Sequence, residues 1–374
     1  MPKFPVEKHT NSVAAVEQAM KQWLEKQKEG AAHTAADALH LTYSLEIELY
    51  LIDLYLYRAR PDLVLCGRTL QGLSPSKNLF PNTPGYHGVP SRAQVFLEEV
   101  QEEAKKQGVS ITFRAKEEVP TQFALELVVQ EAAKAPEYKQ EVLDVLMRLA
   151  SDHDLKVLLH PQPFAGFPAS AQYCRWSFQT GKGSLTTPLR FPLQCTGTLL
   201  HFNTLATRLI EEHTGTLAQL ETSLAAAADT LHCAANEDVP ALVQAYREDT
   251  YARQLERELH TLSELTINHF VSAAVKHVNL ILENIRGLKE VLPPEEYNQA
   301  ASTQFKVISI TMTYVNELRL LIHDVLEALK DPNKAKEEGP QVMEEVRKRI
   351  DHLEMIVDQE FWPVPTYRDL LYLD

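Results

Sequence analysis

The chain has 374 residues, 44% of them hydrophobic, which is enough to bury a core larger than that of one small domain. Its formal net charge is −14, from 51 acidic and 37 basic side chains, and no basic stripe is visible. Such a surface repels polyanions, so we expect no nucleic-acid partner. The N-terminus has no apolar signal core, and no uncharged apolar run approaches the roughly 20 residues that cross a bilayer. These features predict a cytoplasmic protein without a membrane anchor.

The four cysteines are far apart in the chain and form no C-x-x-C pair; they are Cys66, Cys174, Cys195 and Cys233. This spacing argues against both a zinc cluster and a disulfide framework. We interpret the cysteines as reduced structural residues.

The first forty residues form a predicted helical segment, because residues 11–30 carry apolar side chains at helical spacing. The pattern then changes to period two over residues 41–53. Apolar side chains such as Leu45 and Ile47 occupy one face, and Glu46 and Glu48 lie on the other. This alternation predicts a half-buried strand.

Strands and helices alternate through the rest of the first half. We predict a loop at residues 73–90, a helix from Ser91, strands at 110–113 and 123–129, a helix at 138–151, a strand at 157–159 and a loop at 161–171. Residues 41–200 are therefore expected to form one core of strands and helices.

From residue 218 onward the pattern is almost wholly helical. Three apolar stripes at helical spacing begin at Val271, Ile310 and Val342, and the breaks fall at residues 293–294 and 331–332. Such stripes are typical of an antiparallel bundle or a subunit contact, so we predict a C-terminal helical domain over residues 201–374.

Glu46 and Glu48 are the first candidates for chemistry. Two carboxylates at i and i+2 of a strand point to the same face, where both can reach a hard divalent cation such as Mg²⁺ or Mn²⁺. The alternative is a solvated strand face, which also carries charged residues. The spacing alone leaves both interpretations open.

Motifs in two separated blocks surround this pair. The first block holds residues 45–53, 60–63, 66–70, 114–127, 158–166 and 176–177; the second holds residues 265–269, 282–289 and 361–368. In this order they resemble the type III glutamine synthetases. The resemblance covers most of residues 41–180 and 250–374. It implies an α+β fold, with part of an antiparallel-sheet catalytic core packed against helices and followed by a C-terminal helical bundle.

The family transfers the γ-phosphoryl group of ATP to glutamate and then lets ammonia displace phosphate, which requires cations held by carboxylates and a histidine. By resemblance, Glu46, Glu48 and Glu117 match metal-binding glutamates. A further metal glutamate is replaced by Ala124, and the metal-binding histidine is replaced by Tyr173.

Two other residues are less directly related to the catalytic site of the family. Ser177 matches a serine on the nucleotide side of the family site. Glu126 lies two residues from Ala124, about 6 to 7 Å away along the strand, and we interpret it as a solvated residue.

A longer difference lies between about residues 200 and 250, where the chain passes directly into the helical block. The missing family segment would carry a metal glutamate, arginines that hold phosphate and a protective flap. The chain is also too short at its N-terminus for the family's small β-grasp domain. ATP binding of the family kind is therefore not expected, and losing one element of such a set lowers rates by orders of magnitude.

We consider three hypotheses for function. The first is a catalytically inactive pseudoenzyme that acts as a regulatory, binding or assembly subunit, as a homo-oligomer or with an authentic glutamine synthetase. The second is a sensor that binds one Mg²⁺ or Mn²⁺ ion, with or without nucleotide, through Glu46, Glu48 and Glu117. The third is a residual ATP-dependent ligase with an altered substrate.

Overall fold

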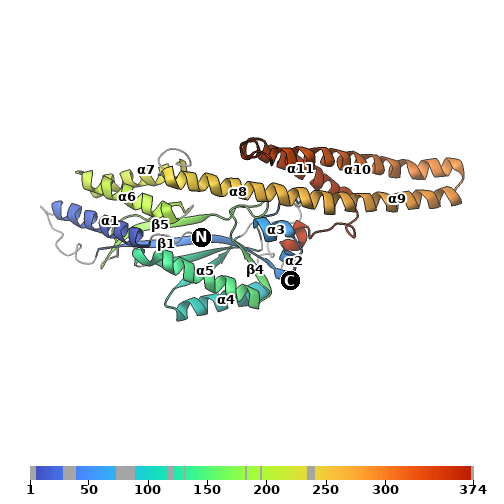
Figure 1. Cartoon of the computed structure of the whole chain (residues 1–374). Coiled ribbons are helices and arrows are strands. Elements are labelled where there is room, and N and C mark those ends of the chain that lie inside the picture. The colour runs from blue at the N-terminus through green and yellow to red at the C-terminus, as the bar shows by residue number, and fades with distance from the viewer. Residues whose placement is uncertain are drawn as a thin grey trace.

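The computed structural model describes residues 6–27, 39–72, 89–116, 119, 121–129, 131–181, 183–193, 196–233 and 241–371. It contains an antiparallel sheet, helices packed on that sheet, and a long helical arm (Figure 1). Of the predicted loop at 73–90 only residues 89–90 are described, and residues 28–30 of the predicted first helix also lie outside the description.

All strand pairs of the seven-stranded sheet are antiparallel, in the order β2-β3-β1-β5-β6, with β4 also paired to β1 and β7 to β5. The strands are β1 (His40–Asp53), β2 (Ile111–Ala115), β3 (Gln122–Val129), β4 (Leu155–Leu158), β5 (Gln172–Thr180), β6 (Gly183–Ser184) and β7 (Leu189–Pro192). The four predicted strands are present, and the α+β class with an antiparallel sheet is confirmed. Strands β5 to β7 were not predicted.

Strand β1 is buried on both faces, so the prediction of a half-buried strand was wrong. Glu46, Glu48 and Tyr50 of the polar face are only 4%, 7% and 0% exposed. The reason is that β1 is central, with strands on both edges, and that other groups cover its polar face. The Tyr50 hydroxyl donates to the Pro168 carbonyl at 2.8 Å, for example.

Helices cover the apolar face of the sheet. They are α1 (Val6–Lys26), α4 (Ser91–Lys106), α5 (Ala135–Asp152), α6 (Thr196–Glu212) and α7 (Leu217–Cys233). Their buried side chains form one cluster with the apolar residues of β1. The helical pattern begins earlier than residue 218, because α6 already packs here: Phe202 contacts the rings of Trp176 and Phe191, with centroids 5.3 and 4.6 Å apart. The domain boundary at residue 200 stays a prediction, but α6 and α7 share the core of the sheet.

The helical arm begins with one long rod, which consists of α8 (Ala241–Leu265), a π-helical turn (Thr266–Phe270) and α9 (Val271–Val291). Helix α10 (Pro294–Ala328) runs back along this rod, and α11 (Pro332–Ile356) reverses direction again (Figure 1). The predicted antiparallel bundle is confirmed. Both predicted breaks are present, since Pro294 is the first residue of α10 and the Asp331 side chain caps α11. The predicted second stripe is buried at Leu318 and Val325 but not at its start, where Ile310 is exposed and Thr311 is buried. Since α10 packs against both α9 and α11, its buried face is not a single stripe.

The C-terminal segment returns to the sheet and joins the two blocks of motifs. Helices α2 (Leu54–Arg58), α3 (Pro61–Cys66) and α12 (Tyr367–Leu370) lie close to the end of β1 (Figure 1). The Arg60 guanidinium donates to both Asp62 oxygens, at 3.0 and 2.7 Å, and to the carbonyls of Pro365 and Gln71, both at 2.8 Å. We call this fully buried group the Arg60 clamp. It holds the C-terminal segment against α3.

Two further expectations concern membranes and thiols. No helix in the described ranges is long and apolar enough to cross a membrane. Cys66 and Cys174 are free and buried, and burial raises the pKa of both thiols, so they stay protonated at neutral pH. Cys195 lies outside the described residues, as does the side chain of Cys233.

Candidate functional site

The polar face of the sheet brings together most of the candidate residues. Glu126 of β3 and Tyr173 of β5 lie directly opposite Glu46, and Ala124 lies opposite Glu48. Directly opposed residues of antiparallel strands point to the same face. All five side chains therefore share one surface.

Glu46 is surrounded by guanidinium groups. Its Oε1 lies 3.4 Å from Nη2 of Arg114, and its Oε2 lies 3.4 Å from Nη2 of Arg175 and 3.5 Å from Nη2 of Arg190. The Glu46 side chain is 6% exposed, whereas those of the three arginines are 68%, 40% and 45% exposed. A buried carboxylate needs opposite charge or hydrogen bonds nearby. Here the chain itself supplies the positive charge.

Glu48 uses both carboxylate oxygens within the protein. Oε1 forms an ion pair with Nζ of Lys116, and Oε2 accepts the backbone N–H of Ala171 at 2.9 Å. The backbone N–H of Glu48 in turn donates to the Ala171 carbonyl at 3.0 Å. Glu48 therefore attaches the loop that follows β4 to the central strand.

Ala124 explains how Arg114 reaches Glu46. Arg114 lies on β2 opposite Ala124, so its side chain must cross β3 to reach β1. Neighbouring strands are about 4.8 Å apart, a span that an extended arginine covers when a small side chain lies beneath it. The methyl group of Ala124 leaves that space.

Tyr173 supports a second arginine. The Arg190 Cζ lies 3.4 Å from the centroid of the Tyr173 ring, which is a cation–π contact. Arg190 on β7 is also paired across the sheet with Arg175 on β5. The tyrosine therefore holds a guanidinium beside Glu46.

Glu126, which was expected to be a solvated strand residue, is partly exposed and also forms an ion pair. Its side chain is 39% exposed, but Oε1 accepts Nη1 of Arg175 at 2.9 Å and the Ser44 hydroxyl at 2.8 Å. Arg175 thus bridges Glu126 and Glu46. Glu126 belongs to the same charge cluster.

Ser177 lies farther along β5 on the same face. It is buried, its Oγ lies 3.1 Å from Oγ1 of Thr42, and the Thr42 hydroxyl also reaches the Ser177 carbonyl at 3.1 Å. These contacts are structural bonds between β1 and β5, and a nucleotide-side role for Ser177 stays a prediction.

The charge cluster bears on the expected divalent cation. Among the described residues, no group of three or more His, Cys, Asp or Glu side chains could hold a metal. A cation at Glu46 would also be repelled by the positive charges of three arginines that lie 3.4 to 3.5 Å from its oxygens. The side chains described here do not fit Mg²⁺ or Mn²⁺. Glu117 lies outside the described residues, so the predicted set of Glu46, Glu48 and Glu117 stays a prediction.

Sequence reasoning missed the basic residues of this face. Arg114 and Lys116 are two positions apart, as are Tyr173 and Arg175, so the period of a strand places each pair on one face. Arg190 could not be found this way, because β7 itself was not predicted.

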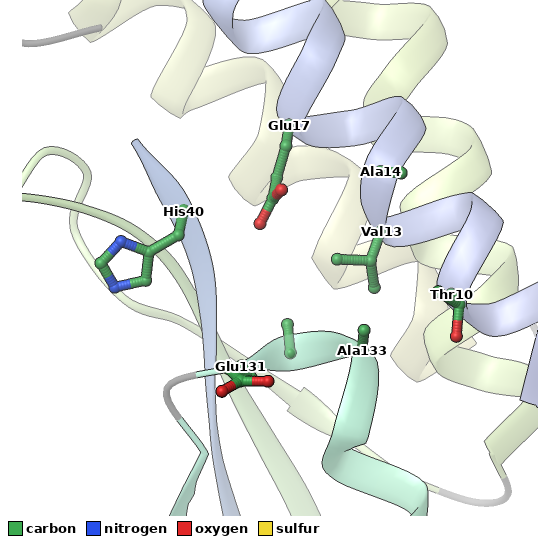
Figure 2. Close-up of a pocket in the computed structure, with 8 residues that line it drawn as sticks. Thr10, Val13, Ala14, Glu17, His40, Glu131 and Ala133 are labelled. Carbon is green, nitrogen blue, oxygen red and sulfur yellow. The ribbon is translucent and has the colours of Figure 1, made fainter. Parts of the chain in front are cut away.

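A pocket of about 380 Å³ lies between α1 and the start of β1, away from this face (Figure 2). Glu17 of α1 and Glu131 line opposite sides of it. Oε1 of Glu17 accepts the backbone N–H of Leu41 at 2.8 Å. Glu17 therefore anchors the start of β1 to α1.

The comparisons with known proteins point to one family. No protein-family model matches the chain. The chain is 23% identical to a glutamine synthetase of Bacteroides fragilis (strain YCH46). The alignment is 516 residues long, gaps included, and covers 87% of this chain and 70% of that protein. It is 31% identical to a type-3 glutamine synthetase of Dictyostelium discoideum over 229 residues (61% of this chain, 30% of that protein). It is 28% identical to a glutamine synthetase of Butyrivibrio fibrisolvens over 218 residues (58% and 31%).

The alignments cover different fractions of the three relatives. The chain spans about a third of the length of the Dictyostelium and Butyrivibrio proteins. The Bacteroides alignment is longer than the whole chain of 374 residues, so that protein has residues inside the aligned region without a counterpart here. Solved structures that match include a novel glutamine synthase homolog (TM-score 0.27, 15% identity, 46% of this chain and 33% of that one) and apo GmaS without ligand (TM-score 0.28, 17% identity, 46% and 36%). The sequence matches show that the chain is similar to glutamine synthetases, one of them a type-3 enzyme.

Proposed function

We propose that this chain is a glutamine synthetase relative that does not catalyse phosphoryl transfer and acts instead as a binding or assembly subunit. The observation that carries the proposal is the pairing of Glu46 and Glu48 with Arg114, Lys116 and Arg175. Phosphoryl transfer needs carboxylates that are free to hold cations against the phosphates. Carboxylates already neutralised by arginine and lysine supply little of that function.

The assembly role is supported by the helical arm. Several large apolar side chains on α9 and α10 are exposed; they include Leu280, Val291, Phe305 and Leu320. Exposed apolar side chains of this size are enriched where a protein contacts another chain. We propose self-association, or association with an authentic glutamine synthetase, through this arm.

A glutamine synthetase assay with ATP, glutamate and ammonia tests the first part, using this protein alone and mixed with the full-length enzyme of its host. We expect no glutamine from the protein alone. ATP hydrolysis that depends on glutamate and is abolished by Glu48→Ala would overturn the proposal and support the residual ligase.

Light scattering after size-exclusion chromatography tests the second part. We expect an oligomer, or co-elution with the host enzyme. A monomer that does not co-elute contradicts the assembly role. Thermal-shift titration with Mn²⁺ examines the sensor hypothesis separately: a shift that is lost in Glu46→Ala and Glu117→Ala favours a cation sensor.

A further inference from the structure

The charge cluster contains more positive than negative groups. Its basic members are Arg114, Lys116, Arg175 and Arg190, and its acidic members are Glu46, Glu48 and Glu126. Among the described residues this leaves one excess positive charge on the face, in a chain whose formal net charge is −14. A local excess of positive charge against an acidic background is unusual and favours anions at this point.

The contacts of the arginines with Glu46 are long. Arg114 and Arg190 each approach Glu46 with one terminal nitrogen, at 3.4 and 3.5 Å. Charge-assisted hydrogen bonds are usually about 2.7 to 2.9 Å long, and a guanidinium has five N–H donors. A ligand can therefore engage these groups without first breaking a strong bond.

A pocket lies next to these charges. Its volume is about 480 Å³, and its lining includes Arg114, Lys116, Glu48, Gln122 and residues 168–169. This volume is in the range of metabolite-sized sites, about 300 to 1,000 Å³. Glu48 does not bring an unpaired negative charge into the pocket, because Lys116 and the Ala171 N–H engage its two oxygens.

We propose that this pocket binds a small anion with carboxylate or phosphate groups directly, through Arg114 and the N–H donors of Lys116 that Glu48 does not use, without a divalent cation. Arg175 and Arg190 neutralise Glu46, so that its charge does not oppose the ligand. Arg114 and Lys116 are two positions apart and point to the same side, which suits two oxygens of one anion. Binding does not depend on the absence of catalysis, so this proposal and the proposed function can fail separately.

Isothermal titration calorimetry at low ionic strength tests the site, with inorganic phosphate and succinate as separate probes and with EDTA present. We expect at least one probe to bind, and the two titrations distinguish phosphate from carboxylate recognition. Arg114→Gln and Lys116→Gln should each weaken binding roughly tenfold, the effect of losing one charged contact.

Arg148→Gln is the matched control. Arg148 is an arginine of similar exposure on α5, 3.5 Å from a glutamate and outside the pocket. This variant should bind like the unchanged protein. Equal loss in Arg148→Gln and Arg114→Gln, or no heat with either probe, overturns the proposal.

A metal titration gives an independent readout. The unchanged protein should bind the anion equally with EDTA and with Mn²⁺. Because Arg175→Gln combined with Arg190→Gln exposes the charge of Glu46, this double variant should bind the anion less tightly and respond more strongly to Mn²⁺. Anion binding that requires Mn²⁺ in the unchanged protein overturns the proposal.

Discussion

Two buried ion clusters of this molecule differ in how completely they are closed. In the Arg60 clamp both charged side chains are 0% exposed, and their hydrogen bonds are 2.7 to 3.0 Å long. Around Glu46 the carboxylate is 6% exposed, and its arginines are partly exposed and 3.4 to 3.5 Å away. Closed geometry is typical of a structural ion pair. The open geometry of the second cluster is suited to an exchangeable ligand.

The largest loss of stability is expected when the Arg60 clamp is broken. Asp62→Ala leaves the Arg60 charge buried without its partner, and it removes the acceptor of the Leu63 and Leu70 N–H groups. We expect a loss of about 3 to 5 kcal/mol in the free energy of unfolding, measured by urea denaturation.

The control for this measurement is Glu338→Ala, which removes an exposed helical ion pair with Lys334. We expect this change to cost less than about 1 kcal/mol. Equal costs for the two variants would show that the clamp is not the structural element described above.

A smaller effect is expected at the charge cluster. Glu46→Ala leaves Arg114, Arg175 and Arg190 near one another, but they are exposed enough to be hydrated. We expect Glu46→Ala to lower the free energy of unfolding by about 1 to 2 kcal/mol in the same denaturation experiment. If Glu46→Ala is as costly as Asp62→Ala, the difference between the two clusters disappears, and with it the main argument for an exchangeable site.

Both the cluster and the clamp were only partly predictable from the sequence. The strand that carries Glu46 and Glu48 could be found because its apolar residues alternate with period two. The same signal exists in residues 173–178, where Cys174, Trp176 and Phe178 alternate with polar residues, so β5 could have been predicted. The partners of Glu46 could not, because they come from strands whose pairing and register are set by long-range contacts.

For the Arg60 clamp, too, the local motif could be found from the sequence but its long-range partner could not. The motif at residues 60–63 was part of the family resemblance, but nothing in the local pattern indicates that Arg60 donates to the Pro365 carbonyl. A charged residue is expected on the surface unless it is paired. Asp62, the ionic partner of Arg60, is two positions away, but the hydrogen bond to the Pro365 carbonyl spans 305 positions of the chain. Burial of the polar face of β1 was missed for the same reason.

The smallest expected change in stability is a pH dependence, at the contact between α8 of the arm and the loop that follows β4. Burial and the positive charge of Arg68 lower the pKa of His160, whose Nδ1 accepts the Gln162 N–H at 3.0 Å. The folded protein therefore holds His160 neutral, while the unfolded chain takes up a proton as the pH falls through about 6.5. Stability contributed by His160 is fully present above that pH and is lost as the pH falls below it. We expect melting temperature to decrease between pH 7.5 and 5.5.

His160→Asn separates this contribution from others, because an asparagine oxygen can still accept the Gln162 N–H but does not titrate. The variant should lose less stability over the same pH range, by about 1 kcal/mol or less. Burial also lowers the pKa of His9, so part of the slope should remain in the variant. An unchanged slope in His160→Asn would assign the acid sensitivity to His9 and other groups. A reduced slope would instead locate it where Gln254 of α8 meets His160 in the loop that follows β4.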